Sequence, residues 1–348
     1  MLSLQIFNKL QHTHVRSDVI TLTSAINACD KGNSWQLAIH SFFWWRDFVV
    51  PNAITCTTLM SALNTKAEWQ QCLCLFQFCL AARFQADAIL FSAAINACAE
   101  GSQWQEAFRI LNSMKPWSFL PDSIMMNAAI SACEKAEEWQ WALHLLDSFA
   151  MLALLPCVVS FAAAASACEK AAQWQFALEL LKEAKQAKSQ TRIDVIMYNA
   201  AISACGRCNQ WLYALNLLAD MEAVKVLPSS VTMNACITAA PNYQEAIDLL
   251  GSIESRSLEA DVIGYNAAIT ACEKDYQWPT ALLLLGHLVH RTLEATVVTW
   301  TSACAACAAS GIWQHALTVQ AVQDLNELTF DAAIRSCAVA QKLTLRRS

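Results

Sequence analysis

The residues of this sequence that could bind a metal or carry out redox chemistry are its cysteines and histidines. Two C-x-x-C pairs, Cys205 with Cys208 and Cys304 with Cys307, have the spacing of a zinc site or a thioredoxin-like site. One cysteine of each pair, however, occupies a position at which cysteine recurs along the chain. The pairs also lie about a hundred residues apart, with no alternation of strands and helices around them. We therefore expect no metal site and no redox cofactor.

Other signatures of catalysis are also missing from the sequence. The seven histidines show no ligand spacing beyond His287 and His290, which we interpret as surface or packing residues. No H-x-E motif precedes a C-x-x-C pair, so a zinc deaminase is not indicated. The sequence predicts no catalytic residue and no cofactor, and we expect a protein that is not an enzyme.

The composition indicates a helical protein with a large apolar interior. Of the 348 residues, 56% are hydrophobic and 15% are charged, which excludes a disordered chain. Glycine and proline number only 7 each, which excludes collagen-like and turn-rich all-β chains. The formal net charge of −6 provides no long-range attraction for nucleic acid. Any nucleic-acid binding would therefore need a local groove.

No targeting or membrane segment stands out in the sequence. The first residues, MLSLQIFNKLQHTHVRSD, lack the apolar core of a secretory signal. The sixteen cysteines are therefore expected to be reduced thiols. Residues 149–168 carry no charge and reach the minimal length of a spanning helix, but Pro156 lies near their middle. We expect no contact with a membrane.

An aromatic residue recurs about every 35 residues and begins the same short sequence motif, as in WQEAF, WQWAL and WQFAL. The nine aromatics are Trp35, Trp69, Trp104, Trp139, Trp174, Trp211, Tyr243, Trp278 and Trp313. A fixed period of this length is the signature of a repeat architecture in which similar units stack on one another.

A second sequence motif begins seventeen residues before most of these aromatics, as in DSIMMNAAISAC from Asp122 and DVIMYNAAISAC from Asp194. Most copies open with Asp, Asn, Ser or Thr, which cap helices by accepting hydrogen bonds from free N–H groups. Each unit is therefore expected to be a helical hairpin whose second helix is opened by the aromatic. Cysteine recurs eleven residues after the start of the unit, which indicates a small packing position, at Cys29, Cys98, Cys133, Cys168, Cys205, Cys272, Cys307 and Cys337.

The predicted fold is all-α, a right-handed α-solenoid superhelix of about nine to ten helical hairpins, because a single hairpin cannot bury its apolar face. Burial of an indole removes roughly 200 Å² from water, so the tryptophans are expected to be the buried anchors. Residues 1–17 are expected to form a partial second helix, residues 18–325 nine tandem repeats and residues 326–348 a truncated tenth. These ends suggest a fragment of a longer protein.

The first-helix wording V-I-x-Y-N-A-A-I-x-A-C, as in the copy from Asp194, resembles the pentatricopeptide repeat. The resemblance covers about 18–337. The sequence departs from the family pattern in three ways. Trp replaces an aliphatic residue at the start of the second helix, and Ser-Ala often replaces Gly-Tyr before the cysteine. The seventh unit is also shortened around Pro241. The resemblance implies binding of single-stranded RNA, with one base read by each repeat.

The resemblance also implies which residues would read the bases. The first reading position is the fifth residue of the first helix, here Thr23, Thr57, Ser92, Asn127, Ala162, Asn199, Asn234, Asn266, Thr301 and Asp331. The second is the residue just before the next first helix, here Asn52, Asp87, Asp122, Cys157, Asp194, Ser229, Asp261, Thr296 and Asn326. Aliphatic residues would wedge between bases at Ile20, Ile54, Ile89, Ile124, Val159, Ile196, Val231, Ile263 and Val298.

Under the family's preferences the chain would read A-G-G-pyrimidine-any-C-U-pyrimidine-A, with Ala162 unable to read a base edge. The residues at the starts of the units are expected to cap helices whether or not the chain binds RNA. Their presence is therefore explained equally well by capping and by base reading. The polar side chains at one position of an otherwise Ala-rich helix favour recognition. Basic residues late in the first helix would meet phosphates or offset the helix dipole, at Lys31, Lys135, Lys170, Arg207 and Lys274.

The leading hypothesis is a monomeric, non-catalytic RNA-binding adaptor in organellar RNA processing, stability or translation, with single-stranded RNA and other RNA-processing proteins as the expected partners. A chloroplast or mitochondrial location follows from the resemblance, although the chain begins with no clear transit segment. The alternative is a protein-binding helical scaffold, which the negative charge favours. Decay of a duplicated gene is a third interpretation, compatible with Ala162, Cys157 and the shortened seventh unit.

Overall fold

The computed structural model describes residues 19–32, 34–45, 51–81, 87–117, 119–186, 194–256, 258–291 and 293–310. The fold is an all-α solenoid of helical hairpins, and the described residues contain no strand. The first helices of the hairpins are α2 (Val19–Lys31), α4 (Ala53–Asn64), α6 (Ala88–Glu100), α8 (Ser123–Lys135), α10 (Val158–Lys170), α12 (Val195–Arg207), α14 (Ser230–Ala239), α16 (Val262–Lys274) and α18 (Val297–Ala309). The second helices are α3 (Trp35–Trp45), α5 (Trp69–Ala81), α7 (Trp104–Ser113), α9 (Trp139–Met151), α11 (Trp174–Gln186), α13 (Trp211–Ala223), α15 (Tyr243–Ser255) and α17 (Trp278–His290). A short 3₁₀ turn, η1 (Lys115–Trp117), follows α7.

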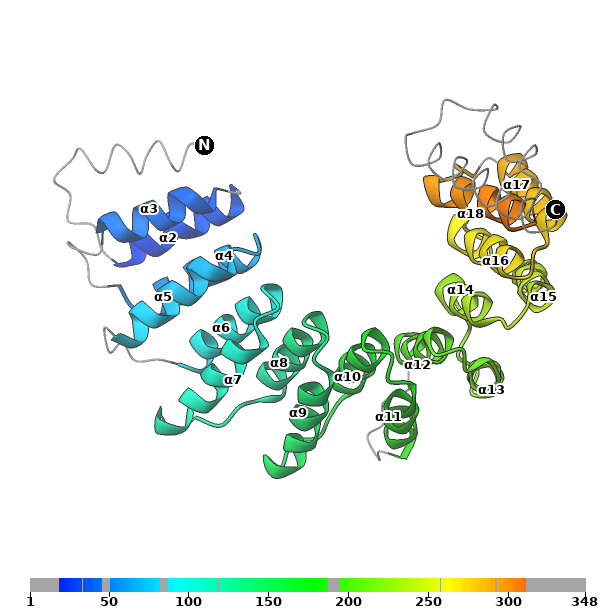
Figure 1. Ribbon diagram of the computed structural model, residues 1–348. Coiled ribbons are helices and arrows are strands. Elements are labelled where there is room, and N and C mark those ends of the chain that lie inside the picture. The colour runs from blue at the N-terminus through cyan, green and yellow to red at the C-terminus, as the bar shows by residue number, and fades with distance from the viewer. Residues whose placement is uncertain are drawn as a thin grey trace, which may run out of the picture. The chain divides into compact units, whose positions relative to one another are not determined.

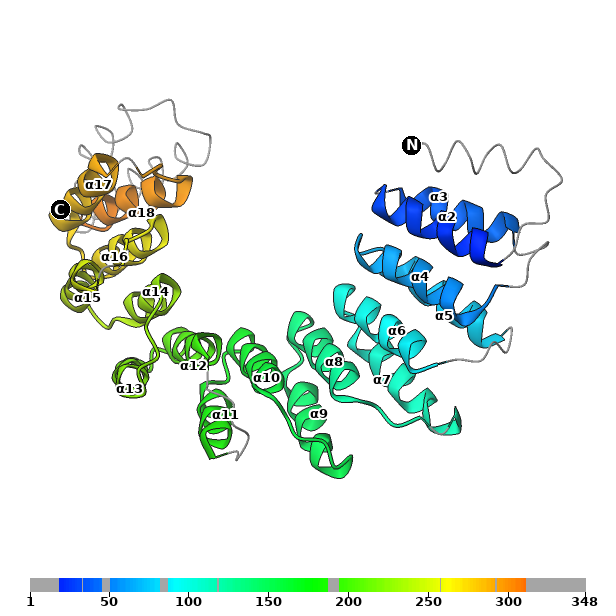
Figure 2. The same ribbon diagram turned by 180° about the vertical axis from the view of Figure 1, so that it is seen from behind.

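The helices group into two compact units, the first holding α2–α10 and the second α11–α18. Within each unit the first helices pack side by side as one layer, and α2, α4, α6, α8, α12, α14 and α16 each also pack against their own second helix in the other layer (Figure 1). The view from behind shows the same two layers (Figure 2). The expected division of the chain into residues 1–17, 18–325 and 326–348 stays a prediction, since residues 1–18 and 311–348 lie outside the described residues.

No described helix is long and apolar enough to cross a bilayer. The uncharged stretch 149–168 is divided between two helices, because α9 ends at Met151 and α10 begins at Val158.

Most of the described first helices begin directly after an Asp, Asn, Ser or Thr side chain that can cap them. The side chains of Asn52, Asp87, Asp122 and Asp194 accept hydrogen bonds from the N–H group three residues later, at 2.8 to 3.1 Å. These bonds satisfy N–H groups that have no partner within the helix, so the caps fix the residue at which each repeat starts.

The turn between the two helices of a hairpin uses a left-handed backbone conformation that the sequence did not reveal. Ser102, Glu137 and Asn209 have φ between 54° and 61°, although none of them is glycine. The next residue then donates its N–H to the carbonyl of the recurrent cysteine, as Gln103 does to Cys98 at 2.8 Å. This pattern closes the C-terminus of a helix and outweighs the roughly 1 kcal/mol cost of a side chain at positive φ.

The core consists of small and aliphatic side chains rather than tryptophans. In α6, Ala94, Ile95, Ala97 and Cys98 are completely buried, and the recurrent cysteine is equally buried in every described repeat that has it. The aromatics that open the second helices are only half-buried at all eight described positions. The prediction that the tryptophans are the buried anchors is therefore wrong, because each of these side chains keeps part of its surface in water, and Trp69 covers a neighbouring turn.

Trp69 illustrates this covering role. A methyl group placed on Gly101, which caps the C-terminus of α6 in the next repeat, would lie only 2.5 Å from Cγ of the Trp69 indole. The indole therefore lies against the backbone of the neighbouring turn, where only a residue without a side chain leaves room for it.

We expect Gly101→Ala to lower the free energy of unfolding by about 1 to 3 kcal/mol, because the new methyl group displaces the Trp69 ring. The matched control is Gly251→Ala on α15, where a methyl group meets nothing within 4 Å. The control should raise stability by up to about 1 kcal/mol, since alanine favours a helix interior. Thermal unfolding followed by circular dichroism measures both effects, and equal stability of the two variants would contradict the packing of Trp69.

Candidate nucleic-acid interface

The structure brings the two predicted reading positions together across repeat boundaries. The side-chain amide of the fifth residue in one first helix donates to the residue that caps the next. Four such pairs lie within hydrogen-bonding distance: Asn127 Nδ2 to Cys157 Sγ at 3.5 Å, Asn199 Nδ2 to Ser229 Oγ at 3.4 Å, Asn234 Nδ2 to Asp261 Oδ1 at 2.9 Å, and Asn266 Nδ2 to Thr296 Oγ1 at 3.4 Å. Each pair therefore forms one polar site built by two repeats.

Hydroxyl side chains at the same position behave differently from the asparagines. Thr23, Thr57 and Thr301 donate their hydroxyl hydrogens to carbonyl groups of their own helix at 2.8 to 2.9 Å. These threonines keep an acceptor oxygen at the position where an asparagine presents an amide. Ser92 is half-buried at the equivalent place, and Asn326 lies outside the described residues.

Two of the predicted positions are poorly accessible. Asn234 is 6% exposed, and its Nδ2 lies 2.9 and 3.1 Å from the two carboxylate oxygens of Asp261. Ala162 is 8% exposed and lies among buried alanines. Asn199, the same residue one repeat earlier, is half-buried, and no pattern in the sequence distinguishes it from the enclosed Asn234.

A file of exposed aliphatic side chains accompanies the polar pairs. The second residue of every described first helix is Ile or Val, and its exposure ranges from 57% at Val231 to 72% at Ile20. The members of this file are Ile20, Ile54, Ile89, Ile124, Val159, Ile196, Val231, Ile263 and Val298. Packing within the protein does not explain these residues, because each leaves most of its apolar surface in water.

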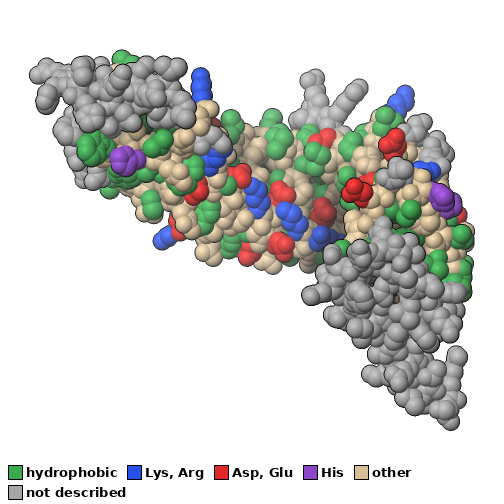
Figure 3. Space-filling model, turned by 90° about the horizontal axis from the view of Figure 1, so that it is seen from above, with side chains coloured by type: hydrophobic (Ala, Val, Ile, Leu, Met, Phe, Trp, Pro, Cys, Tyr) green, Lys and Arg blue, Asp and Glu red, His purple; other side chains and the backbone are tan. Residues whose placement is uncertain are grey.

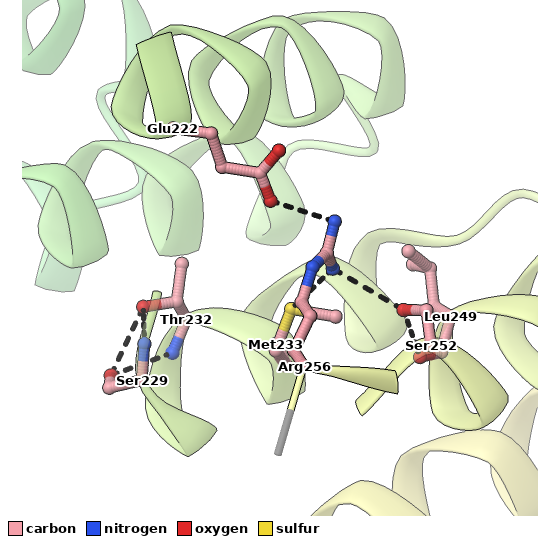
Figure 4. Close-up of polar contacts among 7 residues, drawn as sticks. All are labelled: Glu222, Ser229, Thr232, Met233, Leu249, Ser252 and Arg256. Carbon is pink, nitrogen blue, oxygen red and sulfur yellow. Dashed lines mark hydrogen bonds and ion pairs between the residues drawn. The ribbon is translucent and has the colours of Figure 1, made fainter. Parts of the chain in front are cut away.

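A set of buried hydroxyl groups lies directly beneath the polar pairs and was missed by the sequence analysis. Its members are the third residues of four first helices, Thr55, Ser160, Thr232 and Thr299, all with no exposed surface. Thr232 Oγ1 lies 2.5 Å from Asn199 Oδ1 and 3.1 Å from Oγ of its own cap, Ser229. Figure 4 shows the contacts between Ser229 and Thr232. One pattern in the sequence could have revealed these buried hydroxyls: a Ser or Thr follows three residues after each described cap that is not aspartate.

The predicted phosphate-binding residues are engaged in contacts between repeats at two positions. Lys135 pairs with Glu100 at 3.0 Å and Lys170 with Glu134 at 3.3 Å, both one repeat back. Acidic and basic side chains are intermingled on the face seen in Figure 3. Such partly exposed pairs contribute about 1 kcal/mol or less. The phosphate role of Lys31, Lys135, Lys170, Arg207 and Lys274 stays a prediction.

Further polar contacts tie neighbouring second helices together in the second unit. Arg256, which follows α15, lies 2.8 Å from Glu222 of α13 and 3.2 Å from the Met233 sulfur of α14 (Figure 4). Tyr198 is completely buried and donates its hydroxyl to Asp220 at 3.1 Å. The hydrogen bond from Lys185 to the same carboxylate lowers the pKa of Asp220. These contacts stabilise the stack.

The cysteine pairs considered first are packing residues. Burial raises the pKa of Cys205 to about 11, with the nearby Cys208 thiol as a further cause. Cys208 donates to the backbone carbonyl of Ala172 at 3.0 Å. Among the described residues no group of three or more His, Cys, Asp or Glu side chains is placed to hold a metal ion.

This architecture defines a helical-repeat protein with a regular row of polar pairs. Family models for the pentatricopeptide repeat match the sequence at residues 179–242, as "Pentatricopeptide repeat domain", and at residues 89–115, as "PPR repeat". These matches identify the chain as a pentatricopeptide repeat protein in those two stretches. No curated protein matches the sequence.

Among solved structures, the pentatricopeptide repeat protein PPR10 from maize is similar, with 18% sequence identity and a TM-score of 0.66. The match covers 97% of this chain and 49% of PPR10, so this chain spans about half the length of that protein. A structure of PPR10 in complex with an 18-nucleotide psaJ RNA element has 17% identity and a TM-score of 0.48, with coverage of 92% and 51%. The PPR domain of Arabidopsis thaliana protein-only RNase P 1 in complex with tRNA has 14% identity and a TM-score of 0.41, with coverage of 47% and 88%.

Cys157 should be the most readily ionised of the described cysteines in this interface. Partial burial raises the pKa of its thiol, but hydrogen bonds from Ser160, from backbone N–H groups and from Asn127 outweigh that effect, and the net shift is downward. Burial raises the pKa of Cys168 in the same helix to about 12. Because the thiolate is the reactive form, Cys157 should react with iodoacetamide below pH 9 while Cys168 does not.

Peptide mapping of the alkylated protein between pH 6 and pH 9 measures this difference. Labelling of Cys157 should decline only as the pH falls through its lowered pKa, with the exposed Cys74 as a control for accessibility. Equal labelling of Cys157 and Cys168 in the folded protein would contradict the described environment of Cys157.

Proposed function

We propose that this chain binds single-stranded RNA sequence-specifically, reading one base with each polar pair, and acts as a non-catalytic adaptor in organellar RNA processing, stability or translation. The proposal rests on the pentatricopeptide repeat matches and on one observation. The polar pairs and the exposed aliphatic file lie at fixed positions of successive repeats. An amide can donate and accept at a base edge, and exposed aliphatic side chains can fill the space between unstacked bases.

The spacing of the pairs supports recognition of consecutive nucleotides. Because each pair joins two neighbouring repeats of one unit, the row advances by one site for each repeat. The amides and hydroxyls are held by hydrogen bonds before any ligand arrives, which lowers the entropy lost on binding.

Binding to the oligonucleotide A-G-G-C-A-C-U-C-A tests the proposal directly, measured by fluorescence anisotropy at several salt concentrations. Changing the two G bases to U should weaken binding by roughly 1 to 3 kcal/mol for each base. Thr57→Asn, which creates an Asn–Asp pair with Asp87, should shift the preference from G to U at the second base alone. Equal affinity for both oligonucleotides would contradict base reading.

The aliphatic file provides an independent test. We expect Ile124→Ser to weaken RNA binding by roughly 1 kcal/mol, because an apolar contact with the bases is lost. The unfolding temperature should not change, since Ile124 is 65% exposed. Leu120→Ser is the matched control, because Leu120 is 79% exposed but lies outside the file. A control variant that loses as much affinity as Ile124→Ser would contradict the wedge role.

One observation favours a protein-binding scaffold instead. Trp104 and Trp141, which are on neighbouring second helices, stack at a centroid distance of 5.3 Å, and Trp141 is 40% exposed. If the chain binds none of the oligonucleotides at low salt, the scaffold function is favoured. The organellar location is tested separately by fractionating tissue and detecting the native protein.

A further inference from the structure

The helix caps divide into two classes that differ in the buried residue three positions later. Aspartate caps are followed by residues without a hydroxyl, in the pairs Asp87–Leu90, Asp122–Met125, Asp194–Met197 and Asp261–Gly264. The other caps are followed by a hydroxyl residue, in the pairs Asn52–Thr55, Cys157–Ser160, Ser229–Thr232 and Thr296–Thr299. This correlation holds for every first helix whose cap is described.

Helix capping explains only part of this correlation. An aspartate carboxylate alone satisfies the N–H of the third residue, as Asp122 does for Met125 at 2.8 Å. Where the cap is a weaker acceptor, the hydroxyl completes a capping box by accepting the N–H of the cap, as Thr232 does for Ser229 at 3.0 Å. The third residue also faces the preceding repeat, and this second contact reaches the base-reading side chain.

The buried hydroxyl holds the reading amide by its oxygen. Ser160 donates to Asn127 Oδ1 at 2.6 Å, and the Thr232 hydroxyl lies against Asn199 Oδ1 in the same way. Each hydroxyl oxygen already accepts a backbone N–H, so its own hydrogen is directed to the amide oxygen. The amide nitrogen then faces the cap and the open side, where one of its two hydrogens remains for a ligand.

In the next repeat the amide of Asn234 has the same orientation, with its nitrogen toward the cap, but no hydroxyl holds its oxygen. Its nitrogen donates to the two carboxylate oxygens of Asp261, while its buried oxygen has no hydrogen-bond partner. That oxygen lies where a side chain on Gly264 would be, since a Cβ atom there would come within 2.7 Å of it. Asn199 and Asn234 are therefore the same residue at the same repeat position, but only the amide of Asn199 is held at both its nitrogen and its oxygen.

We propose that Thr232 and Ser160 are positioning residues that set the base preference of Asn199 and Asn127. Each hydroxyl holds the amide oxygen of the preceding repeat, which keeps an N–H group directed at the base and selects an acceptor atom on the pairing edge of a pyrimidine. At Asn199, next to the neutral cap Ser229, this base is cytosine. The inference rests on the proposed function and adds a third residue to the reading pairs of Asn127 and Asn199.

The test compares Thr232→Val, which keeps the shape of the side chain and removes the hydroxyl, with the unaltered chain. The readout is the ratio of affinities for A-G-G-C-A-C-U-C-A and for the same oligonucleotide with A at the sixth base. We expect this ratio to fall about fivefold or more in Thr232→Val and to be restored in Thr232→Ser. The preference for G over U at the second base should be unaffected.

Thr280→Val is the matched control, because it makes the same chemical change on α17, where the hydroxyl donates to the carbonyl of Gln277 at 2.8 Å. Its affinity ratio at the sixth base should equal that of the unaltered chain. The double variant Ser229→Asp/Thr232→Met covers the case in which Thr232→Val fails to fold, because it reproduces the cap arrangement of Asp122 and Met125. It should change the sixth-base preference from C to U.

The outcomes separate this inference from the proposed function. If the unaltered chain shows no preference at either the second or the sixth base, the proposed function is wrong and the inference falls with it. If the unaltered chain prefers C at the sixth base and Thr232→Val keeps the full preference, only the inference is overturned. A variant that loses affinity for both oligonucleotides equally would show that Thr232 acts through stability alone, which also overturns the inference.

Discussion

The close packing of one first helix against the next is the interaction on which the rest of the structure depends. In α6, alanines and a cysteine with no exposed surface occupy the contact positions, and small side chains allow two helix axes to approach closely. This approach places the fifth residue of one repeat within hydrogen-bonding distance of the cap of the next. A larger side chain in the contact would separate the helices and also the two halves of each polar pair.

The residues at the repeat boundaries cap a helix and contact the preceding repeat through the same atoms. Asp261 caps α16 by accepting the N–H of Gly264 at 2.9 Å and also accepts from the Asn234 amide. Ser229 likewise caps α14 while it receives the Asn199 amide. Capping and base reading are therefore compatible interpretations of one residue, and a substitution at a cap should be judged by both stability and ligand preference.

The sequence predicted the features that depend on local chemistry. Helix starts follow from capping side chains such as Asp122, whereas the aliphatic file was expected from the resemblance to the pentatricopeptide repeat. Features that depend on contacts between repeats were not predictable. The half-burial of the tryptophans, the enclosure of Asn234 and the buried hydroxyl of Thr232 arise from side chains about thirty residues apart. The left-handed backbone conformation of Glu137 could not be predicted, because glycine, the residue that usually indicates this conformation, is absent there.

The assembly of each polar pair from two repeats has a consequence for how such chains diverge. Duplication, loss or exchange of a whole hairpin leaves the interior of every unit unchanged but joins a new cap to an old amide at the junction. The junction would acquire a ligand preference that neither parent array had, without any point mutation. Rearrangement of intact modules can therefore produce new specificities faster than substitution within them.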